Sequence, residues 1–295
     1  MTGPPGWRKT QLSALKELGF KNHPLAPCVV LMYDLPSNDP SVVSRRSVSR
    51  GGNDSGSEPE KQELTGVVVI ETDDLLMGGV GPKFDKALDQ LQKRFTFGKW
   101  EELWDSHHDY GGRTLRQTKD YGFEISMTRY LKNRAREIVM HRGRCKNPKD
   151  LAHEGEITGM RGVCGSLNWA AREGMPQGAG DASLLSSTLP TPTIKDLQEA
   201  NAALKRLLQN DVPVKIKPIP LDRLRLLMFA DSSLGNASGG ASQLARMTCA
   251  CDKDLLEGKE ADISILTWKS HKMSRAGANT LFCESNAMSE GLADC

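Results

Sequence analysis

The clearest pattern in the sequence is a pair of short apolar runs around a polar turn. Residues 66–70 are glycine, valine and isoleucine, residues 71–74 read Glu-Thr-Asp-Asp, and residues 75–77 are apolar again. A short apolar run bounded by turn residues is typical of a buried strand, and a brief polar interruption between two such runs is typical of a hairpin. We therefore expect two strands buried on both faces, with Asp73 and Asp74 at the tip of the hairpin.

Helical spacing marks three further segments. Leucines at positions 12, 15 and 18 precede Gly19, which predicts an amphipathic helix that ends at this glycine. A second apolar face runs from Phe84 to Phe95. Thr193 and Asp196 predict a capping box at the start of a third helix. The apolar face of this third helix contains Ile194, Leu197, Leu204, Leu207 and Leu208.

Towards the C-terminal end, apolar segments alternate with turns. Strands are expected at residues 224–230, 243–250 and 263–268, and together they predict an antiparallel meander. Asp231 ends the first strand, and turn residues follow from 232 to 240. Residues 121–130 alternate more weakly and predict one more strand. A helix is expected to begin near Leu281, with one face formed by Glu284, Ala287, Met288 and Leu292.

Composition narrows the class of protein. Residues 36–65 are rich in Ser, Gly, Asn, Asp, Pro and charge, which predicts a segment without regular structure. The 39 basic and 37 acidic residues give a net charge of +2, so net charge alone does not indicate a nucleic-acid-binding protein. The seven cysteines include no Cys-x-x-Cys pair, and no apolar run reaches membrane-spanning length. We expect free thiols, no zinc site, and an intracellular protein, cytoplasmic or nuclear, without a membrane partner.

The adjacent acids Asp73 and Asp74 have two interpretations. Aspartates are common in turns because their side chains bond to nearby backbone, so the pair can be a solvated turn. Alternatively, two neighbouring carboxylates repel each other, and a divalent cation relieves that repulsion. Two-metal phosphoryl transfer uses carboxylates held in this way on rigid elements.

The hairpin and its surroundings resemble the reverse transcriptase of copia-type LTR retrotransposons. The apolar-x-x-Asp-Asp-apolar hairpin is similar to the family's catalytic hairpin, whose usual form is Tyr-x-Asp-Asp; Glu71 occupies the Tyr position here. The string from Leu15 to Phe20 resembles the family helix ending in Leu-Gly-Phe, and residues 84–97 resemble the helix after the hairpin. The resemblance implies that Asp73 and Asp74 are catalytic residues that bind metal.

The C-terminal segments resemble the ribonuclease H domain of the same elements. Phe229-Ala230-Asp231 is similar to the first-strand acid, and residues 266–272 are similar to the family's Trp-Lys-Ser-x-Lys strand end. Residues 281–287 resemble the start of the first helix, where relatives carry an acid in Ser-Thr-Glu-Ala-Glu or a close variant. The resemblance implies that Asp231 and Glu284 are catalytic, metal-binding acids that face one point.

The resemblance also implies an organisation, a fold class and ligands. Residues 1–150 correspond to the C-terminal part of reverse transcriptase, with 36–65 as a disordered insertion; 151–217 form a helical connection and 218–295 a truncated ribonuclease H-like domain. The implied class is α/β (α+β): a partial palm hairpin with helices, then a mixed sheet plus helix. The implied cofactor is Mg²⁺ or Mn²⁺, and the implied partners are an RNA–DNA hybrid or an RNA template with a DNA primer. Because the family's other active-site acids have no counterpart, we expect no competent enzyme from this chain alone.

A basic cluster supports an alternative function. It is either a solvated helix face or a phosphate-facing patch, and the absence of interleaved aromatic residues favours the solvated face. In the alternative, the chain is a non-catalytic remnant or host protein that binds nucleic acid through such basic segments. The cluster contains Lys132, Arg134, Arg136, His141, Arg142, Arg144 and Lys146.

Overall fold

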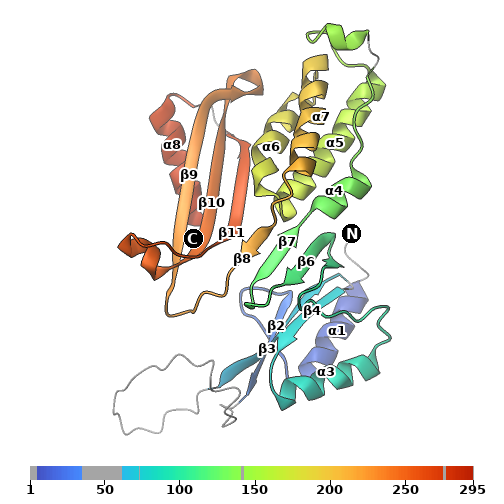
Figure 1. The fold of residues 1–295 in the computed structure, drawn as a ribbon, viewed down its shortest axis with the longest axis vertical. Coiled ribbons are helices and arrows are strands. Elements are labelled where there is room, and N and C mark those ends of the chain that lie inside the picture. Colours follow the sequence, from blue (N-terminus) through green and yellow to red (C-terminus); the bar gives the residue numbers. More distant parts are fainter. Residues whose placement is uncertain (1–4, 35–61, 73, 141–142, 275–276, 295) are drawn as a thin grey trace. The chain divides into compact units, whose positions relative to one another are not determined.

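The computed structural model describes residues 5–34, 62–72, 74–140, 143–274 and 277–294 (Figure 1). The chain divides into two compact units, Met1–Glu101 and Glu102–Cys295. The described residues form seven α-helices and three antiparallel sheets, so the α+β class is confirmed. Every pairing between named strands in these residues is antiparallel, and the mixed sheet expected near the C-terminus is therefore wrong. The division at residues 150 and 217 remains a prediction.

The first unit is built on a four-stranded sheet in the order β1-β2-β3-β4. The β3–β4 hairpin is present as predicted, but its strands are not buried on both faces. Val68 and Ile70 are buried whereas Val67 and Val69 are half-buried, because successive side chains point to opposite faces. The strands are β1 (Lys21–Asn22), β2 (Val29–Asp34), β3 (Glu63–Glu71) and β4 (Asp74–Gly79).

Two helices, α1 (Pro5–Glu17) and α3 (Pro82–Arg94), supply the rest of the core of this unit. Gly19 follows α1 with φ +93°, as predicted for a glycine at a helix end. The ring of Phe84 in α3 lies over the paired glycines Gly66 and Gly79, whose missing side chains leave room for it. The core cluster is Leu15, Phe20, Val30, Met32, Val68, Ile70, Phe84, Ala87 and Leu91. The predicted insertion lies outside the described residues except for residues 62–65, which lead into and begin β3.

The second unit begins with a sheet in the order β5-β6-β7-β8, which the hydrophobic pattern did not predict apart from β7. Its strands are β5 (His108–Tyr110), β6 (Arg113–Gln117), β7 (Phe123–Ser126) and β8 (Val214–Ile216). The weak strand expected at 121–130 ends at Ser126, because helix α4 (Thr128–Arg134) begins two residues later. Thr128 and Leu131 of that helix, three residues apart, are its buried residues.

Helices α5 (Glu154–Glu173), α6 (Ala179–Thr188) and α7 (Ile194–Gln209) form the main core of the second unit. The predicted capping box is present: Thr193 N donates to Asp196 Oδ2 at 2.7 Å, and Asp196 N donates to Thr193 Oγ1 at 3.4 Å. Asn201 of α7 is buried and bonds both backbone groups of Ile138, accepting from its N–H at 2.8 Å and donating to its carbonyl at 2.9 Å.

The predicted meander is present in the order β11-β10-β9, as β9 (Leu224–Ala237), β10 (Ala241–Asp252) and β11 (Ile263–Lys272). Strand β9 does not end at Asp231. Ser232 and Ser233 pair with Leu244 and Gln243 of β10, so the turn expected at 232–240 begins only after Ala237.

Helix α8 (Thr280–Ala293) packs on β9 and β10, and the side chain of Asn279 caps its N-terminus at 2.8 Å from Phe282 N. The helix begins near Leu281 as predicted, but two members of the predicted face, Met288 and Leu292, are 54% and 63% exposed and do not pack on the sheet. The buried stripe is instead the small residues Cys283, Ala287 and Gly291, which let the helix lie close to the sheet. Short 3-10 segments occur at Arg144–Lys146, Pro176–Gly178, Ser238–Gly240 and Lys253–Glu257.

Candidate functional sites

The end of the β3–β4 hairpin is the first candidate site. Glu71 pairs directly with Asp74, so the hairpin closes in a tight turn, and Thr72 has the left-handed φ of +59° that such turns use. Asp74 is the first residue of β4 and its side chain is exposed. Asp73 lies outside the described residues. The position predicted for Asp74 is confirmed, while a catalytic role for either acid remains a prediction.

The second candidate site involves β9 and α8. Ser232 Oγ donates to Glu284 Oε1 at 2.8 Å, and Ala230 packs against the cluster that contains Cys283 and Ala287. Ser232 and Ala230 therefore point towards α8. Because side chains alternate along a strand, Asp231 between them points to the opposite face. The predicted convergence of Asp231 and Glu284 on one point is wrong.

The face that carries Asp231 can be traced across the sheet. Phe229 pairs with Met247, and Met247 pairs with Trp268, so these three side chains share one face with Asp231. Trp268 Nε1 donates to the Ala171 carbonyl of α5 at 2.6 Å, which places this face on the side of the helical core. The Trp268 of the predicted Trp-Lys-Ser motif thus anchors the sheet to α5.

An ion-pair network that the sequence did not reveal holds the C-terminal half of α8. The Arg246 guanidinium of β10 binds both Asp294 and Glu290, and Glu290 lies 3.2 Å from His271 Nε2. Hydrogen bonding to Asp294 raises the pKa of Arg246, and the same bond lowers the pKa of Asp294. Burial lowers the pKa of His271, and Glu290 opposes that shift. Both acids are paired with Arg246, so the network supplies no unpaired carboxylate near Glu284.

The described residues do not fit the divalent ion that the resemblance implies at Asp231 and Glu284. A hard cation such as Mg²⁺ takes several oxygen ligands, which must converge. Here the two carboxylates lie on opposite faces, and Glu284 is already bonded by Ser232. Within the described ranges, no cluster of three or more His, Cys, Asp or Glu residues could hold a metal. The six described cysteines are free thiols, as predicted.

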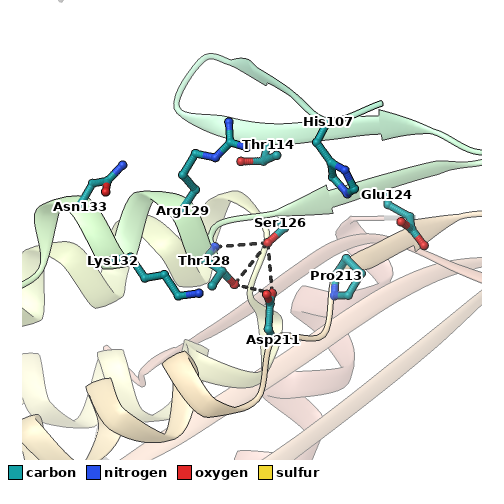
Figure 2. Close-up of a pocket in the computed structure, with 10 residues that line it drawn as sticks. All are labelled: His107, Thr114, Glu124, Ser126, Thr128, Arg129, Lys132, Asn133, Asp211 and Pro213. Atoms are coloured by element: carbon teal, nitrogen blue, oxygen red, sulfur yellow. Dashed lines mark hydrogen bonds between the residues drawn. The ribbon is translucent and has the colours of Figure 1, made fainter. Parts of the chain in front are cut away.

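A pocket of about 360 Å³ opens in the second unit between β6, β7, α4 and the segment before β8 (Figure 2). Asp211 accepts hydrogen bonds from the hydroxyls of Ser126 and Thr128, at 3.3 Å for Ser126. Arg129 is paired with Asp109 at 2.9 Å. The polar groups at the centre of the pocket are therefore bonded to one another. The lining residues are His107, Thr114, Glu124, Ser126, Thr128, Arg129, Lys132, Asn133, Asp211 and Pro213.

The basic cluster divides into structural and exposed members. Arg144 is paired with Glu156 at 3.2 Å and also donates to the Leu151 carbonyl, and Arg136 donates to the Ala135 carbonyl at 2.8 Å. The side chains of these two arginines therefore bind backbone carbonyls close to them in the sequence. The side chains of Lys132, Arg134 and Lys146 are exposed, whereas His141 and Arg142 lie outside the described residues.

No protein-family model, curated protein or solved structure matches this chain. The resemblance to copia-type elements therefore rests on short motifs and on their order along the chain. In the part of the chain that the structure describes, no helix is both long enough and apolar enough to span a membrane.

Proposed function

We propose that this chain is related to the reverse transcriptase and ribonuclease H region of copia-type Pol polyproteins, and that it binds nucleic acid without extending or cleaving it. The observation that carries the proposal is the β3–β4 hairpin. Its sequence motif lies on a hairpin in which Glu71 pairs with Asp74, with a sheet and two helices forming the core behind it.

The order of elements near the C-terminus supports the same relationship. Three antiparallel strands are followed by a helix that packs on the first two of them. The Trp-Lys-Ser motif lies in β11, and Glu284 lies in the first half of α8. A motif and a chain order that agree are better support than either alone, since single short motifs match by chance.

The absence of cleavage follows from the placement of Asp231 and Glu284. Hydrolysis with two metals requires carboxylates that converge on both ions. Asp231 and Glu284 do not converge, so no catalytic step is assigned to them. Mg²⁺ or Mn²⁺ remains a proposed ligand at the hairpin pair, Asp73 and Asp74.

A fluorescent RNA–DNA hybrid tests this proposal. The purified chain is expected to raise the anisotropy of the hybrid, while gels show neither cleavage nor primer extension in Mg²⁺ or Mn²⁺. Asp231→Asn and Glu284→Gln should leave the affinity unchanged. Cleavage that Asp231→Asn abolishes would show that the acids do cooperate. A chain that binds neither the hybrid nor a primed RNA template would refute the proposal.

The exposed basic residues favour a second candidate, a non-catalytic protein that binds nucleic acid through its surface charge alone. Lys132, Arg134 and Lys146 are exposed and belong to one stretch of chain. In this case Lys132→Ala and Arg134→Ala should weaken hybrid and DNA duplex equally, and each should reduce the salt slope by about 1. Binding that changes when the hairpin is mutated, but not when Lys132 or Arg134 is replaced, would favour the first candidate.

A further inference from the structure

Four aromatic rings form a continuous row in the first unit. The ring centroids of Trp7 and Phe95 are 5.5 Å apart, those of Phe95 and Phe97 are 6.1 Å apart, and those of Phe97 and Trp100 are 5.2 Å apart. Trp7 comes from α1, and the other three follow α3, so two separate segments build the row. Each neighbouring pair packs edge to face, which is a favourable geometry for aromatic rings.

The row is at the surface and not in the core. Trp7 is 36% exposed and Trp100 is 40% exposed, while Phe95 and Phe97 are half-buried between them. The buried core of this unit is complete without the two tryptophans and is mainly aliphatic. Packing of the unit therefore explains the two phenylalanines in the middle and leaves the tryptophans at both ends unexplained.

Basic residues lie next to these rings in the sequence, and the acids Glu101 and Glu102 follow Trp100 directly. The two segments that carry them, residues 7–9 and 93–100, contain Arg8, Lys9, Lys93, Arg94 and Lys99 and no acid. Arg94 lies over the Phe95 ring at 6.0 Å and is paired with Glu17 at 2.5 Å. Lys9 and Lys99 form no ion pair with any residue that the structure describes. Lys99 directly precedes Trp100, and a cation next to an exposed ring suits a polyanion that also carries flat apolar groups.

We propose that this row, Trp7, Phe95, Phe97 and Trp100, is a stacking surface for the bases of an unpaired nucleic-acid strand. Proteins that bind single strands combine aromatic rings, on which bases stack, with cations that follow the backbone. The interleaving of aromatic and basic residues that is missing from the 132–146 cluster is present at residues 93–100. This inference rests on the proposed function, because it names the form of nucleic acid that the first unit binds.

The test uses the full chain and a labelled unpaired oligothymidylate, compared with a duplex of equal length. Trp7→Ala and Trp100→Ala are each expected to weaken binding of the unpaired strand by about 5- to 150-fold. Trp100→Phe should retain most of the affinity, because it keeps a ring. Lys99→Gln should reduce the salt slope by about 0.7 without changing the packing of the row.

The matched control is Trp104→Ala. Trp104 is 45% exposed and also packs on another ring, that of Tyr121 at 5.2 Å, but no Lys or Arg lies within four residues of it in the sequence. This change should leave binding unaltered. Circular dichroism and thermal unfolding establish that each variant is folded; if Trp7→Ala is not, Trp100→Ala and Lys99→Gln still decide the question.

Two results would overturn the inference. One is a folded Trp100→Ala variant that binds the unpaired strand as tightly as the parent does. The other is a parent chain that binds the hybrid but not the unpaired strand, which would leave the proposed function standing and remove only the stacking surface. If the parent binds no nucleic acid, both proposals fail.

Discussion

The Phe84 ring packs in the space that Gly66 and Gly79 leave open, which predicts how substitutions at these glycines change stability. A Cβ added at Gly79 would lie 2.5 Å from Phe84 Cγ and 2.6 Å from Cε2, distances that real side chains do not tolerate. A Cβ added at the neighbouring Gly78 would meet nothing within 4 Å. The two substitutions Gly79→Ala and Gly78→Ala are therefore a matched pair that differ only in the space available.

The magnitude follows from two opposing effects. Replacing glycine by alanine restricts the unfolded chain and stabilises the folded state by about 0.4–1 kcal/mol where space allows, as at Gly78. Forcing an extra methyl group into a packed core costs about 1–3 kcal/mol, because the ring or the backbone must shift. Gly79→Ala should therefore be less stable than Gly78→Ala by about 1–3 kcal/mol.

The effect must be measured on the first unit alone, because the chain has two compact units. Hydrogen exchange of peptides that cover β3 and β4 reports that unit directly, and urea unfolding by circular dichroism gives the global value. Gly66→Ala should act like Gly79→Ala, and the double variant should be less than additive, because both methyl groups displace one ring. Equal exchange rates in Gly79→Ala and Gly78→Ala would show that the Phe84 ring is not held over Gly79.

Three further predictions concern other parts of the chain. Asn201→Ala leaves the N–H and carbonyl of buried Ile138 without partners and should cost about 2–6 kcal/mol in urea unfolding, from two groups at about 1–3 kcal/mol each. No measurable loss of stability would contradict the two hydrogen bonds. Arg223 lowers the pKa of Asp252 to about 2, so the pair contributes stability above about pH 4 that is lost as the pH falls towards 2. Asp252→Asn should therefore make the melting temperature less dependent on pH over this range. If the melting temperatures of the variant and the parent fall in parallel as the pH is lowered, the prediction is wrong. Asp74→Asn should weaken Mn²⁺ binding in calorimetry without changing the circular dichroism spectrum, whereas unchanged binding would place any ion elsewhere.

Local sequence patterns predicted those parts of the fold that depend on interactions between residues close together in the sequence. The hairpin, the capping box of α7, the glycine after α1 and the three-stranded meander all appear where periodicity and turn residues indicated them. Apart from β7, the sheet of β5 to β8 did not, because all four of its strands have five residues or fewer and β8 comes from far along the chain. Such pairings depend on tertiary contacts that periodicity does not record.

The candidate sites depended on a finer property, which is the face of an element to which a side chain points. The sequence located Asp231 and Glu284 on the expected strand and helix, yet the extension of β9 through Ala237 and the alternation along it turn Asp231 away. A shift of one residue in register would reverse this outcome. For α8, the small residues Cys283 and Gly291 face the sheet, because close approach matters more there than side-chain size. The aromatic row was detectable from residues 93–100 but needed Trp7 from a distant segment to complete it.

Strand β9 has one more consequence, which concerns solubility. It is 14 residues long and lies at the end of its sheet, and no strand among the described residues pairs with its outer edge. Leu226, Phe229 and Leu234 are each 48% exposed along it. Long uncovered strands of this kind template the addition of another chain, and charged residues on them act as gatekeepers against aggregation. Asp231 and Arg225 are charged residues of this kind on β9. Neutralising Asp231 should therefore promote self-association as the protein concentration rises, even if Asp231 has no catalytic role.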